Sequence, residues 1–182
     1  MGPAVFFDRD GTLVDDPPPG YIAEPEKVSI FPGSAEALAR AHALGYLLVM
    51  VTNQAGIGRG LISWDQYRAV AARVEAMLAE LGVILDGTYM CPHAPERDGE
   101  CPCRKPKLAL YERAGADLGI DYRRSWWVGD RITDLLPSKA LGGEGILVLT
   151  GHGPDHEEAA RREGFAVVPD LAAAVSALAA PR

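Results

Sequence analysis

Short apolar runs alternate with segments of helical periodicity along nearly the whole chain, and this alternation restricts the fold more than any other feature. The apolar runs that we expect to form strands are Ala4–Phe7, Tyr46–Thr52, Ile84–Met90, Trp126–Gly129, Gly145–Leu149 and Ala166–Val168. The segments that we expect to form helices are Ser34–Leu44, Trp64–Leu81, Leu108–Leu118, Asp134–Leu141, His156–Glu163 and Leu171–Ala179. Such alternation predicts an α/β fold with a mostly parallel central sheet and helices on both faces.

Local signals fix the ends of some of these elements. Ser63 and Gln66 form a capping-box pattern at the start of the Trp64–Leu81 helix, and Gly82 ends that helix. Pro137 is tolerated in the first turn of a helix, so the helix that contains it should not begin much before its predicted start. The run of prolines before Gly20 predicts a stiff, tight turn.

Length and composition exclude several classes of protein. The 182 residues contain no internal repeat and no low-complexity linker, so we expect a single domain over residues 1–182. A net charge of −7 argues against a nucleic-acid partner, and the longest apolar run, Tyr46–Val51, is too short to span a membrane. No secretory signal precedes Asp8, and an odd number of cysteines, 3, favours a reducing compartment, so we expect a cytoplasmic protein. The absence of a heptad seam favours a monomer.

Carboxylates follow two of the predicted strands. Asp8 and Asp10 come directly after the first strand, with Gly11 behind them to permit a tight turn, and Asp130 and Asp134 follow the Trp126–Gly129 strand. The carboxyl ends of parallel strands meet at one edge of a sheet, and carboxylates meeting there suit a hard divalent ion such as Mg²⁺. Taken alone, the first pair also fits a solvated turn and the second pair fits a helix start.

Phosphate-binding groups are predicted at the same edge. Thr52 and Asn53 end a strand and precede the glycine-rich loop 56–60, which can bring backbone N–H groups and a hydroxyl to a phosphate oxygen. Lys105, with Arg104 beside it, supplies the positive charge that a phosphoryl transition state requires. Each feature alone also fits an ordinary flexible loop or solvated surface.

The cysteines lie close together beside a histidine. Cys91, His93, Cys101 and Cys103 form the pattern C-x-H-x7-C-x-C, which uses every cysteine of the chain. Three thiolates and one imidazole fill a tetrahedral Zn²⁺ shell and leave no open position, so we expect a structural zinc loop at 91–103. Because Arg104 and Lys105 follow this loop, the zinc would fix the segment that presents them.

Four of these motifs together resemble the haloacid dehalogenase (HAD) superfamily of phosphatases. They are Phe6-Phe7-Asp8-Arg9-Asp10-Gly11-Thr12-Leu13, Val51-Thr52-Asn53-Gln54, Arg104-Lys105-Pro106 and Val128-Gly129-Asp130-Arg131. The resemblance implies the three-layer, Rossmann-like fold of that superfamily, here without a large cap domain. It also implies that Asp8 attacks the phosphorus to form an aspartyl-phosphate and that Asp10 acts as general acid and base.

The same resemblance assigns the ligands. The Asp8 carboxylate, the Asp10 carbonyl and Asp130 would hold a catalytic Mg²⁺. Thr52, Asn53 and Lys105 would hold the phosphoryl oxygens. Arg9 is expected to make a supporting contact.

The zinc pattern is similar to two groups of small HAD phosphatases, which act on heptose bisphosphate and on histidinol phosphate. The stretch from Thr52 to Gly60, including Gln54, and the pair Gly20-Tyr21 resemble the heptose group. Two features depart from that group: the proline-rich loop after Asp15, which is more like that of the histidinol phosphatases, and Arg131, where many heptose enzymes have Lys. We therefore expect the sugar phosphate substrate to be a heptose bisphosphate, with histidinol phosphate or another small phosphate ester as the alternatives.

The predicted substrate contacts surround these motifs. They are Tyr21, Asn53, Gln54, Arg59, Arg104, Lys105 and Arg131. Arg59, Arg104 and Arg131 could clamp a second phosphate and give an acidic protein a positive mouth. His152 and His156 are expected to cap a helix or face solvent.

Two alternatives of a different class stay open at this point. A phospho-accepting receiver domain also places Asp, Mg²⁺, Thr and Lys at strand ends, but Asp10 would hydrolyse the phosphoryl bond that such a switch must preserve. A zinc-organised interaction module would bind metal without phosphatase activity.

Overall fold

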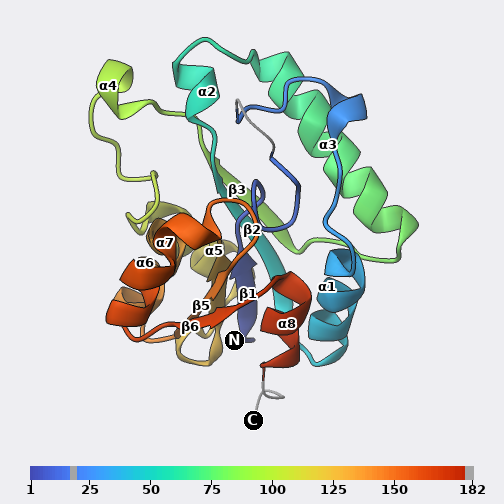
Figure 1. Cartoon of the computed structure of the whole chain (residues 1–182), viewed down its shortest axis with the longest axis vertical. Coiled ribbons are helices and arrows are strands. Elements are labelled where there is room, and N and C mark those ends of the chain that lie inside the picture. The colour runs from blue at the N-terminus through green and yellow to red at the C-terminus, as the bar shows by residue number, and fades with distance from the viewer. Residues whose placement is uncertain (17–19, 179–182) are drawn as a thin grey trace.

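Six parallel strands form one sheet, in the order β3–β2–β1–β4–β5–β6, in the computed structural model, which describes residues 1–16 and 20–178 (Figure 1). The strands are β1 (Ala4–Phe7), β2 (Leu47–Asn53), β3 (Gly87–Cys91), β4 (Trp126–Gly129), β5 (Glu144–Val148) and β6 (Ala166–Val168). This arrangement confirms the predicted α/β fold with a parallel sheet.

Helices cover both faces of the sheet because successive residues of each strand point to opposite sides. Val5 and Phe7 pack in one core with α1 (Ser34–Ala43), α3 (Trp64–Glu80) and α8 (Leu171–Ser176). On the other face, Ala4 and Phe6 pack with α5 (Ala109–Leu118), while α6 (Ile132–Leu141) and α7 (Gly153–Arg162) cover β4, β5 and β6. Figure 1 shows these two helical layers on either side of the sheet.

Several elements form where the sequence predicts them. The bounds of β1, β4 and β6 match the prediction, since each is a short apolar run; β1 and β4 are buried or half-buried, and in β6 the two valines are half-buried. The capping box before α3 is also present, because Gln66 N–H donates to the Ser63 hydroxyl and Ser63 N–H donates to the Gln66 side chain. Gly82 follows α3 with a φ of 76°, as a helix-ending glycine should.

Other boundaries differ from the prediction, and each difference has a local cause. The third strand begins at Gly87 rather than Ile84. Just before it, the Asp86 side chain accepts a hydrogen bond from the Leu48 N–H at 2.8 Å, so that a side chain takes the place of a strand partner at this point. Helix α6 begins at Ile132, where Arg131 N–H donates to the Asp134 carboxylate at 3.0 Å. Pro137 therefore lies in the second turn, not the first, and its missing N–H removes one helical hydrogen bond.

Several short helices and turns form in segments that are too short to show a sequence periodicity. The short helices α2 (Ala55–Gly58) and α4 (Pro95–Asp98), and the 3₁₀ turns η1 (Pro25–Lys27) and η2 (Tyr122–Arg124), lie in segments predicted as loops. The predicted proline turn at 17–19 lies outside the described residues. The last helix ends at Ser176, short of its predicted end at Ala179. Within the described ranges, no helix is both long enough and apolar enough to cross a membrane.

The sheet register brings the polar strand ends to one edge. Phe7 pairs with both Met50 and Val128, and Asn53 pairs with Cys91. The residues that follow β1, β2, β3 and β4 therefore emerge side by side at the carboxyl edge, beneath α2 and α4 in Figure 1.

Candidate active site

The turn after β1 presents Asp8 and Asp10 at the carboxyl edge of the sheet. The N–H groups of Leu13 and Val14 both donate to the Arg9 carbonyl, at 2.9 and 2.8 Å, which folds the chain back on itself. Gly11 has a φ of 80° within this turn, a conformation that only glycine adopts readily. The predicted tight turn is present, and Asp8 begins it at the end of β1, the strand that lies between β2 and β4.

Lys105 is buried at the centre of the site. Its Nζ lies 2.9 Å from Asp8 Oδ1, 2.8 Å from Asp134 Oδ1 and 2.7 Å from the Val51 carbonyl oxygen. Burial by itself lowers the pKa of Lys105, but the charges of Asp134 and Asp8 more than compensate, so that its pKa is raised. The ammonium group therefore stays charged beside Asp8.

Three carboxylates converge on one point. Asp8, Asp130 and Asp134 each place an oxygen within 4.8 Å of the others, and all three residues are buried. Burial, followed by the charges of Asp134 and Asp8, raises the pKa of Asp130 to about 8. Burial also raises the pKa of Asp8 to about 6, against the lowering effect of Lys105. One ammonium group does not balance three carboxylates, so the cluster lacks positive charge.

The donor set fits a hard divalent cation. Asp130 Oδ2 accepts from the His152 N–H at 2.8 Å, whereas Asp130 Oδ1 is buried and has no hydrogen-bond partner among residues 1–16 and 20–178. A buried carboxylate oxygen without a partner is costly unless an ion binds it. Oxygen ligands of this kind are the ones that Mg²⁺ prefers.

The Asp10 carboxylate lies apart from this cluster. It accepts two bonds from the buried Arg9, at 2.8 and 2.9 Å, and one from Gln54 Nε2 at 2.6 Å. The Arg9 guanidinium also lies over the Tyr67 ring, 5.7 Å from its centre. Arg9 thus makes the supporting contact that the sequence predicts.

Thr52, Asn53 and Gln54 end β2 next to these groups. Gln54 is buried, and its amide donates to Asp10 and, at 3.0 Å, to Thr52 Oγ1. Asn53 bonds to both sides of the Lys105 backbone: Lys105 N–H donates to Asn53 Oδ1 at 3.1 Å, and Asn53 Nδ2 donates to the Lys105 carbonyl at 3.3 Å. Asn53 therefore fixes the segment that carries Lys105.

The cysteines and the histidine of the 91–103 loop form a second cluster. The three sulfur atoms lie 3.3 to 3.6 Å from one another, and His93 Nδ1 lies 3.6 Å from Cys91 Sγ and 3.2 Å from Cys103 Sγ. Ligands of a tetrahedral zinc ion with Zn–S bonds of about 2.3 Å lie roughly 3.7 Å apart. The cluster predicted from the spacing is thus present, with a size suited to zinc.

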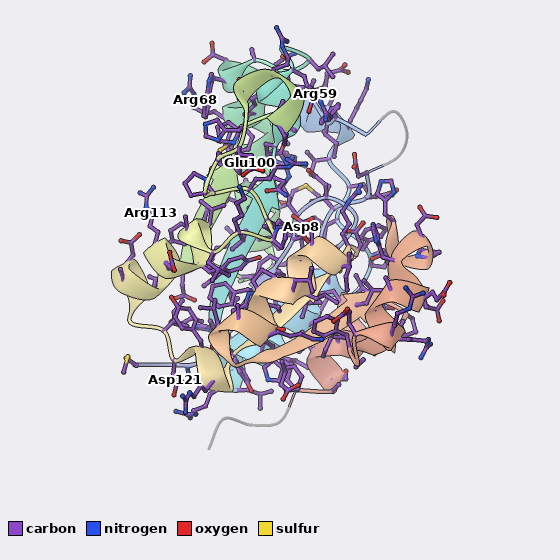
Figure 2. All side chains as sticks on the ribbon, turned by 90° about the vertical axis from the view of Figure 1, so that its left-hand side faces the viewer. Asp8, Arg59, Arg68, Glu100, Arg113 and Asp121 are labelled. Atoms are coloured by element: carbon purple, nitrogen blue, oxygen red, sulfur yellow. The ribbon has the colours of Figure 1, made fainter. Side chains whose placement is uncertain are left out.

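A cavity of about 680 Å³ opens above Asp8, Asp10 and Lys105. Of the predicted substrate contacts, Tyr21, Asn53, Arg59, Arg104, Lys105 and Arg131 line it. Gln54 is buried beneath it, against Asp10 and Thr52. In Figure 2, Glu100 and Arg59 lie above Asp8, at the end of the molecule opposite Asp121.

Arg59 joins two other loops at the rim of this cavity. Its Nε donates to Glu96 at 2.5 Å, and its Nη1 donates to the Tyr21 hydroxyl. The Arg59 carbonyl accepts from the Arg97 side chain at 2.5 Å. The glycine loop, the Tyr21 loop and the cysteine-bearing loop therefore meet at this side chain.

Arg104 contributes an unused donor to the cavity wall. Its Nη1 atom is buried and finds no hydrogen-bond partner in the part of the chain that the structure describes. A guanidinium in this state favours an anionic ligand.

The structure also places residues at the cavity that the sequence did not single out. Asp16 and Glu100 line it, and burial raises the pKa of Asp16 to about 6. His156, predicted to cap a helix or face solvent, is half-buried and lines the cavity as well. It does so because α7 begins at Gly153, so that His156 lies in the first turn of a helix that starts at the site. No spacing signal distinguishes Asp16 from its neighbour Asp15.

The fold and this site define a phosphatase of the HAD class: a parallel sheet with no large cap within residues 1–16 and 20–178, an aspartate pair after β1, and Thr, Lys and further aspartates at neighbouring strand ends. A family model described as HAD-hydrolase-like matches residues 102–174. The solved structure of the D,D-heptose 1,7-bisphosphate phosphatase from B. bronchiseptica, complexed with magnesium and phosphate, superposes with a TM-score of 0.86, at 32% identity over 96% of both chains.

Curated proteins give a closer assignment. The D-glycero-beta-D-manno-heptose-1,7-bisphosphate 7-phosphatase of Pasteurella multocida is 45% identical over 83% of this chain and 84% of its own length. The protein of the same name from Haemophilus ducreyi is 44% identical over 81% of this chain and 84% of its own. The chain belongs to the family of D-glycero-D-manno-heptose 1,7-bisphosphate 7-phosphatases.

Proposed function

We propose that this chain removes the 7-phosphate of D-glycero-D-manno-heptose 1,7-bisphosphate through an aspartyl-phosphate intermediate on Asp8. The observation that carries the proposal is the surroundings of Asp8. Oδ1 accepts from the Arg9 N–H at 2.8 Å and contacts Lys105 Nζ at 2.9 Å, which leaves Oδ2 to attack phosphorus from the floor of the cavity. A carboxylate attacks without prior activation.

The reaction then divides into two displacements. Asp8 Oδ2 forms a bond to phosphorus as the bond to the sugar oxygen breaks, and Asp10 donates a proton to that oxygen. In the second step Asp10 takes a proton from a water molecule, whose oxygen attacks the same phosphorus and frees Asp8. Arg9 and Gln54 hold the Asp10 carboxylate in place during both steps.

Three side chains bind the phosphoryl oxygens. Thr52 Oγ1 accepts from Gln54, so its own proton is free to be donated to the phosphoryl group. Lys105 neutralises charge beside Asp8, and Asn53 holds the Lys105 segment while lining the cavity. Asp8, Asp130 and the Asp10 carbonyl would hold Mg²⁺, which supplies positive charge that offsets phosphate–carboxylate repulsion.

The rim of the cavity suits the remainder of a sugar bisphosphate. Arg59, Arg104 and Arg131 line it, and the unpaired Arg104 Nη1 can donate to a second phosphate. Tyr21, tied to Arg59, borders the same space.

We propose that zinc bound by Cys91, His93, Cys101 and Cys103 is structural. Four protein ligands leave no position for substrate, and Lys105 lies two residues beyond Cys103. Thiols that must bind zinc persist in a reducing compartment, which supports a cytoplasmic protein.

The test is phosphate release from both anomers of the heptose bisphosphate and from histidinol phosphate, with and without Mg²⁺. We expect kcat/KM for one heptose anomer to exceed that for histidinol phosphate by about a hundredfold or more, which corresponds to ~2.7 kcal/mol of transition-state stabilisation. A preference of that size for histidinol phosphate would overturn the substrate assignment.

Asp8→Asn provides the control for the chemistry. The amide cannot form the ester, so turnover should be lost while substrate still binds. Turnover at the wild-type rate in this variant would exclude the covalent intermediate. A phosphoryl group that persists on the wild-type protein for hours would instead favour a signalling role.

A further inference from the structure

The loop between β5 and α7 lies against Asp130, although it belongs to none of the motifs discussed above. Thr150 Oγ1 donates to the Gly11 carbonyl at 2.6 Å, and the His152 N–H donates to Asp130 Oδ2 at 2.8 Å. Residues 150–152 thus connect the turn after β1 with the carboxylate after β4. In Figure 1 this loop passes over the turn that follows β1.

Two glycines make this close approach possible. A Cβ atom at Gly151 would lie 2.4 Å from the Gly11 Cα and 2.5 Å from Asp130 Oδ2. A Cβ atom at Gly11 would lie 2.3 Å from the same carboxylate oxygen. Real Cβ contacts are not this short, so any larger residue must displace the Asp130 carboxylate or the backbone that faces it.

The result is a carboxylate with one occupied and one free oxygen. Asp130 is fully buried, and the loop donates its hydrogen bond to Oδ2, so that Oδ1 has no hydrogen-bond partner among the described residues. A ligand residue held in this way meets a cation without first having to be reoriented.

We infer that Thr150, Gly151 and the His152 N–H form a positioning segment that sets the affinity for the divalent cation by orienting Asp130. The inference rests on the magnesium site in the proposed function. These groups touch no reacting atom. They act through Asp130, and through the Gly11 turn that follows the Asp10 carbonyl, another proposed Mg²⁺ ligand.

The test measures Mg²⁺ binding by isothermal titration calorimetry, with MgCl₂ added to the zinc-loaded protein. Gly151→Ala should weaken Mg²⁺ binding by about 10- to 100-fold, the usual effect of disturbing a residue that orients a metal ligand. Gly164→Ala is the matched control: Gly164 also has a positive φ, 81°, but a Cβ there meets nothing within 4 Å. The Gly164→Ala variant has the same kind of backbone strain but no contact with Asp130, so its affinity for Mg²⁺ should equal that of the wild type.

A second pair of variants tests the segment without altering a glycine. Thr150→Val removes the donor to the Gly11 carbonyl and should weaken Mg²⁺ binding, whereas Thr150→Ser keeps the hydroxyl and should restore it. This pair decides the question if Gly151→Ala does not fold. Thermal unfolding without Mg²⁺ distinguishes the positioning role from a merely structural one. A structural role would lower Tm in these variants and leave their affinity for Mg²⁺ unchanged.

Each outcome has one meaning. Folded Gly151→Ala and Thr150→Val proteins that bind Mg²⁺ as tightly as the wild type would overturn the positioning role. A wild-type protein that does not bind Mg²⁺ would overturn the magnesium site itself, and with it that part of the proposed function.

Discussion

Asp130→Asn should make the magnesium-free protein more stable at neutral and alkaline pH. Burial, then Asp134 and Asp8, raise the pKa of Asp130 to about 8, whereas an aspartate in the unfolded chain has a pKa of about 4. A pKa difference of about four corresponds to an upper bound of about 6 kcal/mol at ~1.4 kcal/mol for each pKa unit. Because Asp8 lies close enough to share this proton, we expect the variant to gain about 3 to 6 kcal/mol at pH 8.

The sign follows from the proton balance. Between about pH 4 and pH 8 the folded protein holds a proton on Asp130 that the unfolded chain has lost, so the stability of the wild type falls as pH rises through this interval. Below pH 4 both states are protonated and the two proteins should be equally stable. Above pH 8 the difference should reach its full size and stay constant.

Urea unfolding at several pH values, in buffer freed of divalent ions by a resin, measures this difference. Added Mg²⁺ should raise the stability of the wild type and leave that of Asp130→Asn nearly unchanged, because the variant lacks the ligand. Stability–pH curves that run parallel for the two proteins would refute the reasoning.

Three further predictions concern the charge balance, the zinc loop and the rim. Lys105→Met removes the buried ammonium group that pairs with Asp8 and Asp134, so the free energy of unfolding should fall by about 3 to 5 kcal/mol at pH 8, as measured in urea; a loss below about 1 kcal/mol would contradict the proposed pairing. Cys103→Ser should lower the bound zinc measured by mass spectrometry, and both Tm and phosphate release should fall with it; full activity without zinc would contradict its role. Arg59→Ala should raise KM more for a bisphosphate than for a monophosphate, and equal changes in a steady-state assay would remove its role in binding the second phosphate.

The sequence predicts those parts of the fold that are determined by local patterns. The apolar run at Ala4–Phe7 and the capped helix that begins at Trp64 form where they are expected, because burial pattern and capping act within a few residues. The boundaries at Gly87 and Ile132 differ because side chains of Asp86 and Asp134 bond to the backbone there. Periodicity does not detect such bonds.

The site follows the same distinction. Asp8 and Asp130 are predicted to meet because the carboxyl ends of parallel strands lie at one edge of the sheet, and the cysteine spacing predicts the second cluster. Sequence spacing does not reveal the contact between Gly151 and Asp130, since a glycine in a loop is ambiguous until its neighbours are known. It also misplaces His156, whose position depends on where its helix begins.

The strand order has a consequence for synthesis of the protein. β1 lies between β2, which follows within fifty residues, and β4, which is more than a hundred residues away along the chain. On the ribosome, the nascent polypeptide therefore carries an unpaired edge on its central strand until residues 126–129 emerge. Fragments that stop before Trp126 should aggregate, and a chaperone that shields exposed strand edges should prevent it.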